Sequence, residues 1–193
     1  MKKYYAVKNG RQSGIYLTWE ECEKQVKGFK GAVFKSFSTQ EEAEAFLHNQ
    51  PVLSQEGLLA YVDGSYNKKS QEYGYGCVLI EHQKVIAKYN GKGNHKDYLD
   101  MRNVAGEIAG AQMAIRYAIE HHYPMICIYY DYEGIEKWAT QQWKARKIGT
   151  QAYRDFIQES LQKIDIQFMK VLAHSGDIYN EMADSLAKKA VGL

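Results

Sequence analysis

Two aspartates stand directly after apolar runs that are typical of buried strands. Asp63 follows residues 58–62, four apolar residues and a tyrosine, and Asp131 follows residues 125–130, which are apolar or aromatic. Because these runs are apolar rather than alternating, they predict strands that are covered on both faces. An ionised carboxylate at the end of a buried strand costs several kcal/mol unless a partner compensates its charge.

Two further acids, Glu107 and Asp184, lie in segments that we expect to be helical. If all four carboxylates converge, their repulsion requires cations, and Mg²⁺ is the usual cation of carboxylate sites that handle phosphate. Each acid alone also has a simpler interpretation, because an Asp at a strand end often caps a turn and a helical acid is usually solvated. The four together predict a metal-dependent site acting on phosphate.

The elements that must position these acids follow from the hydrophobic periodicity of residues 58–193. We predict strands at 58–66, 73–80, 84–90, 125–130 and 165–171, and helices at 103–120, 135–144, 151–163 and 179–191. Residues 91–100 are predicted to form a loop. The order βββαβααβα implies a mixed sheet with helices on its faces, in which the second and third strands are antiparallel neighbours of the first.

The first 47 residues form a separate predicted unit of order ββαβα. We predict strands at 4–7, 14–17 and 32–37, and helices that open at capping boxes at Thr18 and Thr39 and end near Val26 and Leu47. Residues 48–57 are polar, contain a proline and lack periodicity, which indicates a linker. The predicted domains are therefore 1–47 and 58–193.

Charge is distributed unevenly along the chain, although the net charge is only +2. Residues 1–37 hold eight basic and three acidic residues, a balance of +5, whereas the remaining 156 residues have a balance of −3. A small basic unit in front of a mildly acidic body favours the binding of a polyanion by the first unit.

Cysteine usage and hydropathy indicate the compartment. Cys22, Cys77 and Cys127 are far apart and form no C-x-x-C pair, which argues against a zinc site or a disulfide framework and fits a reducing environment. No apolar run approaches the length of a membrane span, and Lys2 and Lys3 are not followed by the apolar segment of a signal peptide. We expect a cytoplasmic protein without membrane association, and nothing in the sequence requires more than a monomer.

The motifs around the four acids resemble those of type 1 ribonuclease H. They are Tyr61-Val62-Asp63-Gly64-Ser65, Asn103 with Glu107, Asp131, and the stretch from His174 to Asp184, in which a histidine stands ten residues before the final Asp. Residues 1–47 resemble the hybrid-binding domain that precedes the catalytic domain in many such enzymes, through Gly14–Cys22 and Phe34–Phe37. The resemblance covers nearly the whole chain and implies a mixed five-stranded sheet flanked by helices, preceded by a small α+β hybrid-binding domain.

This resemblance implies an endoribonuclease that hydrolyses the RNA strand of an RNA–DNA hybrid and leaves 5′-phosphate and 3′-hydroxyl ends. Asp63, Glu107, Asp131 and Asp184 would hold two Mg²⁺ ions, with Mn²⁺ as a substitute. His174 would assist proton transfer or product departure, and its simpler interpretation is a histidine of a surface loop. The compact architecture without an organellar leader favours a housekeeping role in a bacterial cytoplasm, such as the removal of primers and R-loops.

Substrate contacts in the catalytic domain are also implied by resemblance. The candidate side chains for reading ribose 2′-hydroxyls are Ser65, Asn103 and Glu133, together with the backbone around Gly64. Glu133 departs from the family, which commonly has an Asn and a Gln among these positions. Arg102 stands where many relatives have a threonine that contacts a DNA phosphate, and a guanidinium could make that contact more strongly. The start of the family's basic handle is matched by Trp138, Trp143, Lys144, Arg146 and Lys147, but there is little room for the full protrusion.

In the first domain, the candidates for hybrid binding are aromatic residues among lysines. The resemblance implies that Tyr5 and Phe34 pack on deoxyribose and that Trp19 and Lys35 contact DNA phosphates. Trp19 lies just inside a predicted helix start, where anions bind. Alternatively, Trp19 and Phe34 fill a very small hydrophobic core.

Two other functions remain open on the sequence alone. A different metal nuclease of the same fold, such as a resolvase or transposase core, would share the acids but would not need a hybrid-binding domain. A hybrid-binding protein without activity would gain from losing negative charge near phosphates, whereas all four acids are present here.

Overall fold

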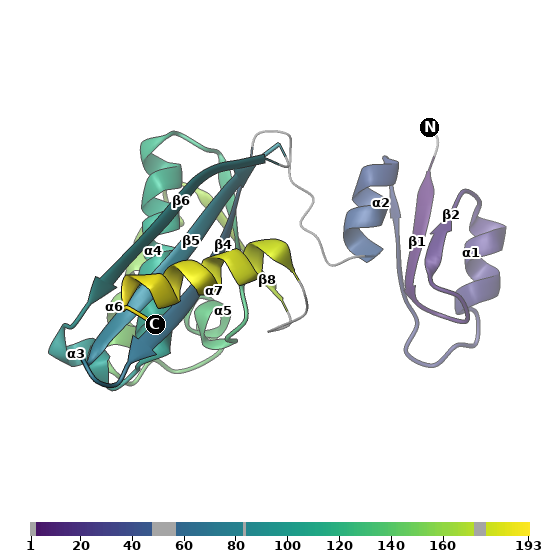
Figure 1. Cartoon of the computed structure of the whole chain (residues 1–193). Helices are drawn as coiled ribbons and strands as arrows, with labels where there is room; N and C mark the ends of the chain where they lie inside the picture. Colours follow the sequence, from purple (N-terminus) through teal and green to yellow (C-terminus); the bar gives the residue numbers. More distant parts are fainter. Residues whose placement is uncertain (1–2, 48–56, 83, 172–176) are drawn as a thin grey trace. The chain divides into compact units, whose positions relative to one another are not determined.

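Two compact units make up the chain, residues 1–54 and residues 55–193. The computed structural model describes residues 3–47, 57–82, 84–171 and 177–193 (Figure 1). The predicted linker, residues 48–57, lies outside the described residues except for Gly57.

Unit 1 (residues 1–54) is a three-stranded antiparallel sheet with one helix on each face (Figure 1). Its elements are β1 Tyr4–Asn9, β2 Gly14–Tyr16, α1 Trp19–Val26, β3 Val33–Phe37 and α2 Gln40–Leu47, and the strand order is β2-β1-β3. Adjacent residues of a strand face opposite sides, so Val7 packs with Cys22 of α1 while Ala6 is buried on the other face. The Thr18 hydroxyl accepts the Glu21 N–H at 3.3 Å, as the predicted helix start requires.

Unit 2 (residues 55–193) contains the predicted mixed five-stranded sheet. Its strands are β4 Leu58–Asn67, β5 Glu72–Glu81, β6 Lys84–Gly93, β7 Met125–Tyr130 and β8 Asp165–Lys170, in the order β6-β5-β4-β7-β8. Strand β5 is antiparallel to both β4 and β6, whereas β7 runs parallel to both β4 and β8. The antiparallel part of the sheet therefore meets its parallel part at β4.

Helices cover both faces of this sheet, which explains the continuous apolar runs of its central strands. The helices are α3 Lys96–Leu99, α4 Asn103–Glu120, α5 Gly134–Ala139, α6 Ile148–Ser160 and α7 Ile178–Ala190. In Figure 1, α7 crosses one face of β4 and β5, and α4 lies behind the sheet. None of the helices in the described ranges is long and apolar enough to cross a bilayer.

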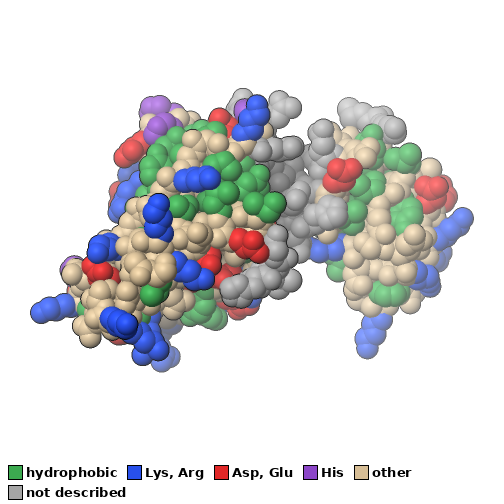
Figure 2. All heavy atoms as spheres, viewed as in Figure 1, with side chains coloured by type: hydrophobic (Ala, Val, Ile, Leu, Met, Phe, Trp, Pro, Cys, Tyr) green, Lys and Arg blue, Asp and Glu red, His purple; other side chains and the backbone are tan. Residues whose placement is uncertain are grey.

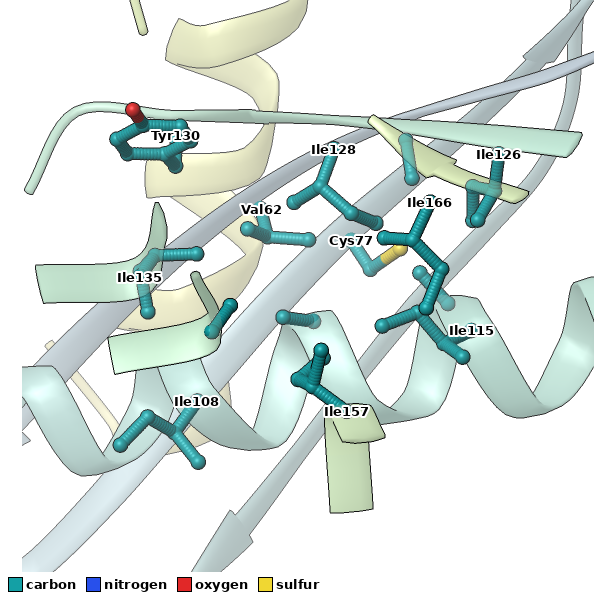
Figure 3. Close-up of a cluster of buried hydrophobic side chains, with 14 of the residues drawn as sticks. Val62, Cys77, Ile108, Ile115, Ile126, Ile128, Tyr130, Ile135, Ile157 and Ile166 are labelled. Atoms are coloured by element: carbon teal, nitrogen blue, oxygen red, sulfur yellow. The ribbon is translucent and has the colours of Figure 1, made fainter. Parts of the chain in front are cut away.

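The main core lies between the sheet and α4, α5 and α6. Figure 3 shows Val62, Ile128 and Cys77 of the sheet meeting Ile108 of α4 and Ile157 of α6, and each of these side chains is at most 1% exposed. Burial of an aliphatic side chain of this size contributes about 1.5–3 kcal/mol. The rigid sheet and α4 thereby form a fixed base for the ends of β4 and β7.

Two glycines allow helices to touch the sheet backbone. A Cβ on Gly64 of β4 would lie 2.0 Å from the Asn103 carbonyl oxygen of α4, and a Cβ on Gly76 of β5 would lie 2.0 Å from the Ala183 carbonyl oxygen of α7. Real Cβ atoms do not approach oxygen this closely, so a side chain at either position would push a helix outward.

The prediction of a loop at residues 91–100 was wrong near both ends of that range. Strand β6 continues to Gly93, because Gly93 pairs with Tyr73 of β5, and α3 occupies Lys96–Leu99. The helix predicted at 135–144 ends at Ala139, shortly before Gln141 adopts a φ of 61°. Pairing with β5 extended strand β6, and a left-handed residue follows the early end of helix α5. Neither feature has a clear periodic signal in the sequence.

Candidate active site

Three of the four predicted acids meet at the junction of β4, α4 and β7. Each of Asp63, Glu107 and Asp131 offers a carboxylate oxygen, and these oxygens lie within 4.8 Å of one another. Strands β4 and β7 are parallel neighbours with Tyr61 opposite Tyr129, so the acids two residues further along come side by side. Helix α4 rests on Gly64, which brings Glu107 to the same point.

The crowding of these carboxylates changes their proton affinity. Burial, followed by repulsion from Asp131, raises the pKa of Asp63 to about 7, although the Gly64 N–H donates to its Oδ1 at 2.6 Å. Burial also raises the pKa of Glu107 well above its ordinary value, and the charges of Asp131 and Asp63 act in the same direction. The backbone N–H of Tyr132 donates a hydrogen bond to Glu107, which lowers the pKa of Glu107 and offsets only part of this rise.

The Glu107 side chain shows that the cluster fits a cation. It is 1% exposed, and its Oε2 atom has no hydrogen-bond partner among the described residues. A buried oxygen without a partner is costly, and a carboxylate costs more than a neutral group. Three hard oxygen donors around one point suit a divalent ion such as Mg²⁺ or Mn²⁺, which would supply the missing partner.

Asp184 lies beside this group but is not one of the three acids within 4.8 Å. Its Oδ2 atom is 2.7 Å from the Nζ atom of Lys188, one turn later in α7, and its charge acts on Asp63. The hydrogen bond to Asp184 raises the pKa of Lys188, and the charge of Asp63 adds to this effect. Lys188 was not among the predicted site residues, although its position four residues after Asp184 on one helix was a usable signal.

A hydrogen bond joins the start of α7 to β4, and no local sequence pattern indicates it. The Asp177 carboxylate accepts the backbone N–H groups of Tyr179 at 3.0 Å and of Asn180 at 3.2 Å, and it also accepts the Tyr61 hydroxyl. The Tyr61 ring stacks on Tyr129 with centroids 4.3 Å apart. The predicted site residue His174 lies outside the described residues.

The predicted substrate residues of unit 2 have different surroundings. Arg102 and Asn103 are exposed at the start of α4, and Arg102 has a φ of 52°, a strained conformation for a residue other than glycine. Ser65 is only 8% exposed. Glu133 is paired with Lys137 and, at 2.7 Å, with Lys170, and these partners lower its pKa to about 2.

A basic hollow lies next to the start of α4. It has a volume of about 310 Å³ and is lined by Asp100, Met101, Val104, Tyr132, Trp138, Lys144, Arg146, Lys147 and Thr150. Four of the five residues that match the start of the family's basic handle therefore line this hollow. The fifth, Trp143, packs against Trp138, with ring centroids 6.0 Å apart. Figure 2 shows Lys and Arg side chains gathered around α3, at the lower left of unit 2.

An aromatic cluster is exposed on unit 1. The Trp19 ring lies 5.8 Å from that of Tyr5 and 5.9 Å from that of Phe34, and Trp19 and Phe34 are each 42% exposed. Such exposure does not fit the alternative that both rings only fill the core. Lys35 alternates to the other face of β3, where its ammonium group lies 5.5 Å from the centroid of Phe37.

Family comparisons match both units of the chain. Residues 3–47 match the family of the ribonuclease H1 N-terminal domain, and residues 55–192 match the RNase H family. The RNase H match alone covers well over half of the chain.

Individual relatives agree with these family matches. Ribonuclease H1 of Homo sapiens is 28% identical over 254 residues, covering 96% of this chain and 88% of that protein. Ribonuclease H of Syntrophomonas wolfei is 28% identical over 141 residues, covering 69% of this chain and 95% of that protein.

Solved structures share the fold of unit 2. RNase H1 from the archaeon Halobacterium salinarum NRC-1 has a TM-score of 0.59 at 21% identity, covering 70% of this chain and 98% of that one. LC11-RNase H1, solved in complex with an RNA/DNA hybrid, has a TM-score of 0.56 at 12% identity, covering 69% of this chain and 99% of that one. The chain therefore belongs to the ribonuclease H family, whose enzymes cleave the RNA strand of RNA–DNA hybrids, and it carries a ribonuclease H1 N-terminal domain in front of its RNase H domain.

Proposed function

We propose that this enzyme hydrolyses the RNA strand endonucleolytically with two bound divalent ions, Mg²⁺ in the first place, and leaves 5′-phosphate and 3′-hydroxyl ends. The observation that carries the proposal is the meeting of Asp63, Glu107 and Asp131 around one point, with a buried Glu107 oxygen that has no partner among the described residues. Bound divalent ions lower the pKa of an attacking water and stabilise the leaving oxygen.

The four acids have distinct tasks in this proposal. Asp63, Glu107 and Asp131 would hold one ion, and Asp184 would join Asp63 in holding the second. Protons compete with cations for Asp63 and Glu107, because burial and mutual repulsion raise the pKa of both groups. Metal affinity should therefore increase as the pH rises through about 7, the pKa of Asp63. His174 keeps its proposed part in proton transfer or product departure.

Two surfaces support the binding of a hybrid duplex. Unit 1 offers the exposed rings of Tyr5, Trp19 and Phe34, which suit contact with sugar and base faces. Unit 2 offers the basic hollow beside α4, where ammonium and guanidinium groups can meet phosphates.

The discrimination of RNA from DNA needs a group that reads the 2′-hydroxyl. Asn103 is the best placed of the three candidates, because it is exposed and lies one turn before Glu107 on α4. Ser65 is largely buried, and both carboxylate oxygens of Glu133 are engaged by lysines. Glu133 would therefore have to leave one lysine before it could contact a ribose.

The proposal is tested with end-labelled RNA–DNA hybrid, duplex RNA and duplex DNA, each incubated with the full chain and MgCl₂. We expect internal cuts in the RNA of the hybrid only. Asp131→Asn should reduce the cleavage rate by about 10³-fold, since the loss of one ligand removes several kcal/mol of transition-state stabilisation, while hybrid binding is kept or improved. Asp165→Asn is the matched control, because Asp165 is an exposed acid that pairs with Met125 at the opposite end of β7.

The same assays separate the competing functions. Cleavage of duplex DNA would favour another metal nuclease, and hybrid binding without any cleavage in Mg²⁺ or Mn²⁺ would favour a pure binding protein. The end chemistry is read from the products, because a 5′-phosphate is sensitive to phosphatase and a 3′-hydroxyl supports extension by a polymerase. Products with 3′-phosphate ends would contradict the two-ion mechanism.

A further inference from the structure

The contact between α7 and β5 lies directly beside the carboxylate cluster. In the β4–β5 pairing, Gly76 is the residue opposite Asp63. A Cβ on Gly76 would lie 2.0 Å from the Ala183 carbonyl oxygen and 2.8 Å from the Ala187 backbone nitrogen. The α7 backbone therefore rests on the sheet backbone next to Asp63, without a side chain between them.

The residue that follows Ala183 is Asp184, the fourth acid. Its distance from Asp63 is consequently set by how closely α7 approaches β5, and this approach is limited at Gly76. The present approach is close enough for the charge of Asp184 to act on Asp63, yet Asp184 remains outside the group of three acids within 4.8 Å. A further retreat of α7 would separate it from the site.

We propose that Gly76 is a positioning residue, which holds Asp184 where it can join Asp63 in binding the second cation. This inference rests on the proposed two-ion function. The atoms that a Gly76 side chain would meet belong to a helix backbone, so they cannot rotate away as a flexible side chain would. With Ala at this position, α7 must lift by about 1 Å to restore even a tight contact, and Mg²⁺ tolerates little change in ligand distances of about 2.0–2.1 Å.

The test compares Gly76→Ala with Gly91→Ala in the full chain. Gly91 is a strand glycine of the same sheet, but the nearest atoms that a Cβ there would meet belong to the Tyr75 side chain rather than to the α7 backbone. The first readout is the rise in Tm on titration with MgCl₂ without substrate, which reports cation affinity independently of activity. The second is the Mg²⁺ midpoint of hybrid cleavage, and the third is the Kd for the hybrid in EDTA.

We expect Gly76→Ala to raise the Mg²⁺ midpoint by about 10-fold to 100-fold, the range found when a group that supports a metal ligand is altered. The hybrid Kd in EDTA should stay within about twofold of the wild type, and Gly91→Ala should keep the wild-type midpoint. A loss of packing alone would lower the Tm at every Mg²⁺ concentration without moving the midpoint. A wild-type midpoint in Gly76→Ala would therefore overturn the inference.

A rescue experiment tests the direction of the displacement. Asp184→Glu adds one methylene of reach, so it should recover part of the lost Mg²⁺ affinity in the Gly76→Ala background and bring no gain in the wild type. No recovery would refute the positioning of Asp184 as the cause.

A second variant covers the case in which Gly76→Ala does not fold. Gly74→Ala would press on the same helix one turn later, 2.6 Å from the Ala187 carbonyl oxygen, and must show a smaller shift in the same direction. An unshifted midpoint there also overturns the inference. If the wild type itself gains no Tm from Mg²⁺ and cuts no hybrid, the proposed function fails rather than the role of Gly76.

Discussion

Replacing Asp63 by Asn should stabilise the metal-free protein at alkaline pH, because it removes a charge that the fold holds at a cost. Burial and Asp131 raise the pKa of Asp63 from 3.8 to about 7. Below about pH 4 the carboxyl group is protonated in both the folded and unfolded states, so its ionisation costs nothing. As the pH rises from 4 to 7, the unfolded chain loses this proton before the folded one does, and the folded state loses relative stability.

The size of this effect follows from the shift. A shift of about three pKa units at 1.36 kcal/mol each means that Asp63 lowers the free energy of unfolding by about 4 kcal/mol at pH 8 and by about 1–2 kcal/mol at pH 5. For a unit of this size, about 4 kcal/mol corresponds to a rise in Tm of about 10 °C.

The assay is scanning calorimetry of the wild type and Asp63→Asn in EDTA at pH 5, 6.5 and 8, with Asp165→Asn as an exposed-acid control. The gain in Tm of Asp63→Asn should grow with pH, and saturating Mg²⁺ at pH 8 should raise the Tm of the wild type but not that of the variant. If Asp63→Asn is no more stable than the wild type at pH 8, or if its gain in Tm is the same at every pH, the folded state does not raise the pKa of Asp63.

Two further predictions concern contacts away from the cluster. Tyr61→Phe keeps the ring stacked on Tyr129 but removes the hydroxyl that Asp177 accepts, so it should lower the free energy of unfolding by about 1 kcal/mol. Thermal melts check this, and an unchanged Tm would contradict the importance of that hydrogen bond. Trp19→Ala should weaken hybrid binding in EDTA by about 10-fold, through the loss of a stacking surface worth about 1–3 kcal/mol, with kcat unchanged. A lower kcat at unchanged affinity would contradict a role of unit 1 in binding alone.

The fold of both units could largely be predicted from residue patterns. The continuous apolar runs before Asp63 and Asp131 indicated central strands correctly, since helices α4 and α7 cover the two faces of β4 and every residue of β7 is buried. The Thr18 capping pattern located the start of α1. The main errors occurred at residues 91–100, where β6 continues in its pairing with β5, and after Ala139, near the left-handed Gln141. Helix α6 also spans Ile148–Ser160 rather than the predicted residues 151–163.

The site was less accessible to such reasoning. The four acids could be named from their motifs, since each motif is a local string of residue types. Their distances could not, because the parallel pairing of β4 with β7 and the backbone contacts at Gly64 and Gly76 join segments that are far apart in the chain. The Asp177–Tyr61 contact had no sequence signal for the same reason.

Residue types and their spacing thus specified the elements of this protein and the kind of chemistry that it can carry, since periodicity, capping and motifs act over a few neighbouring residues. The separation of Asp184 from the other acids, the crowding that raises the pKa of Asp63 and the buried oxygen of Glu107 arise only when the helices settle on the sheet. Those quantities depend on backbone approach to within about an ångström, and no local pattern encodes such distances between remote segments.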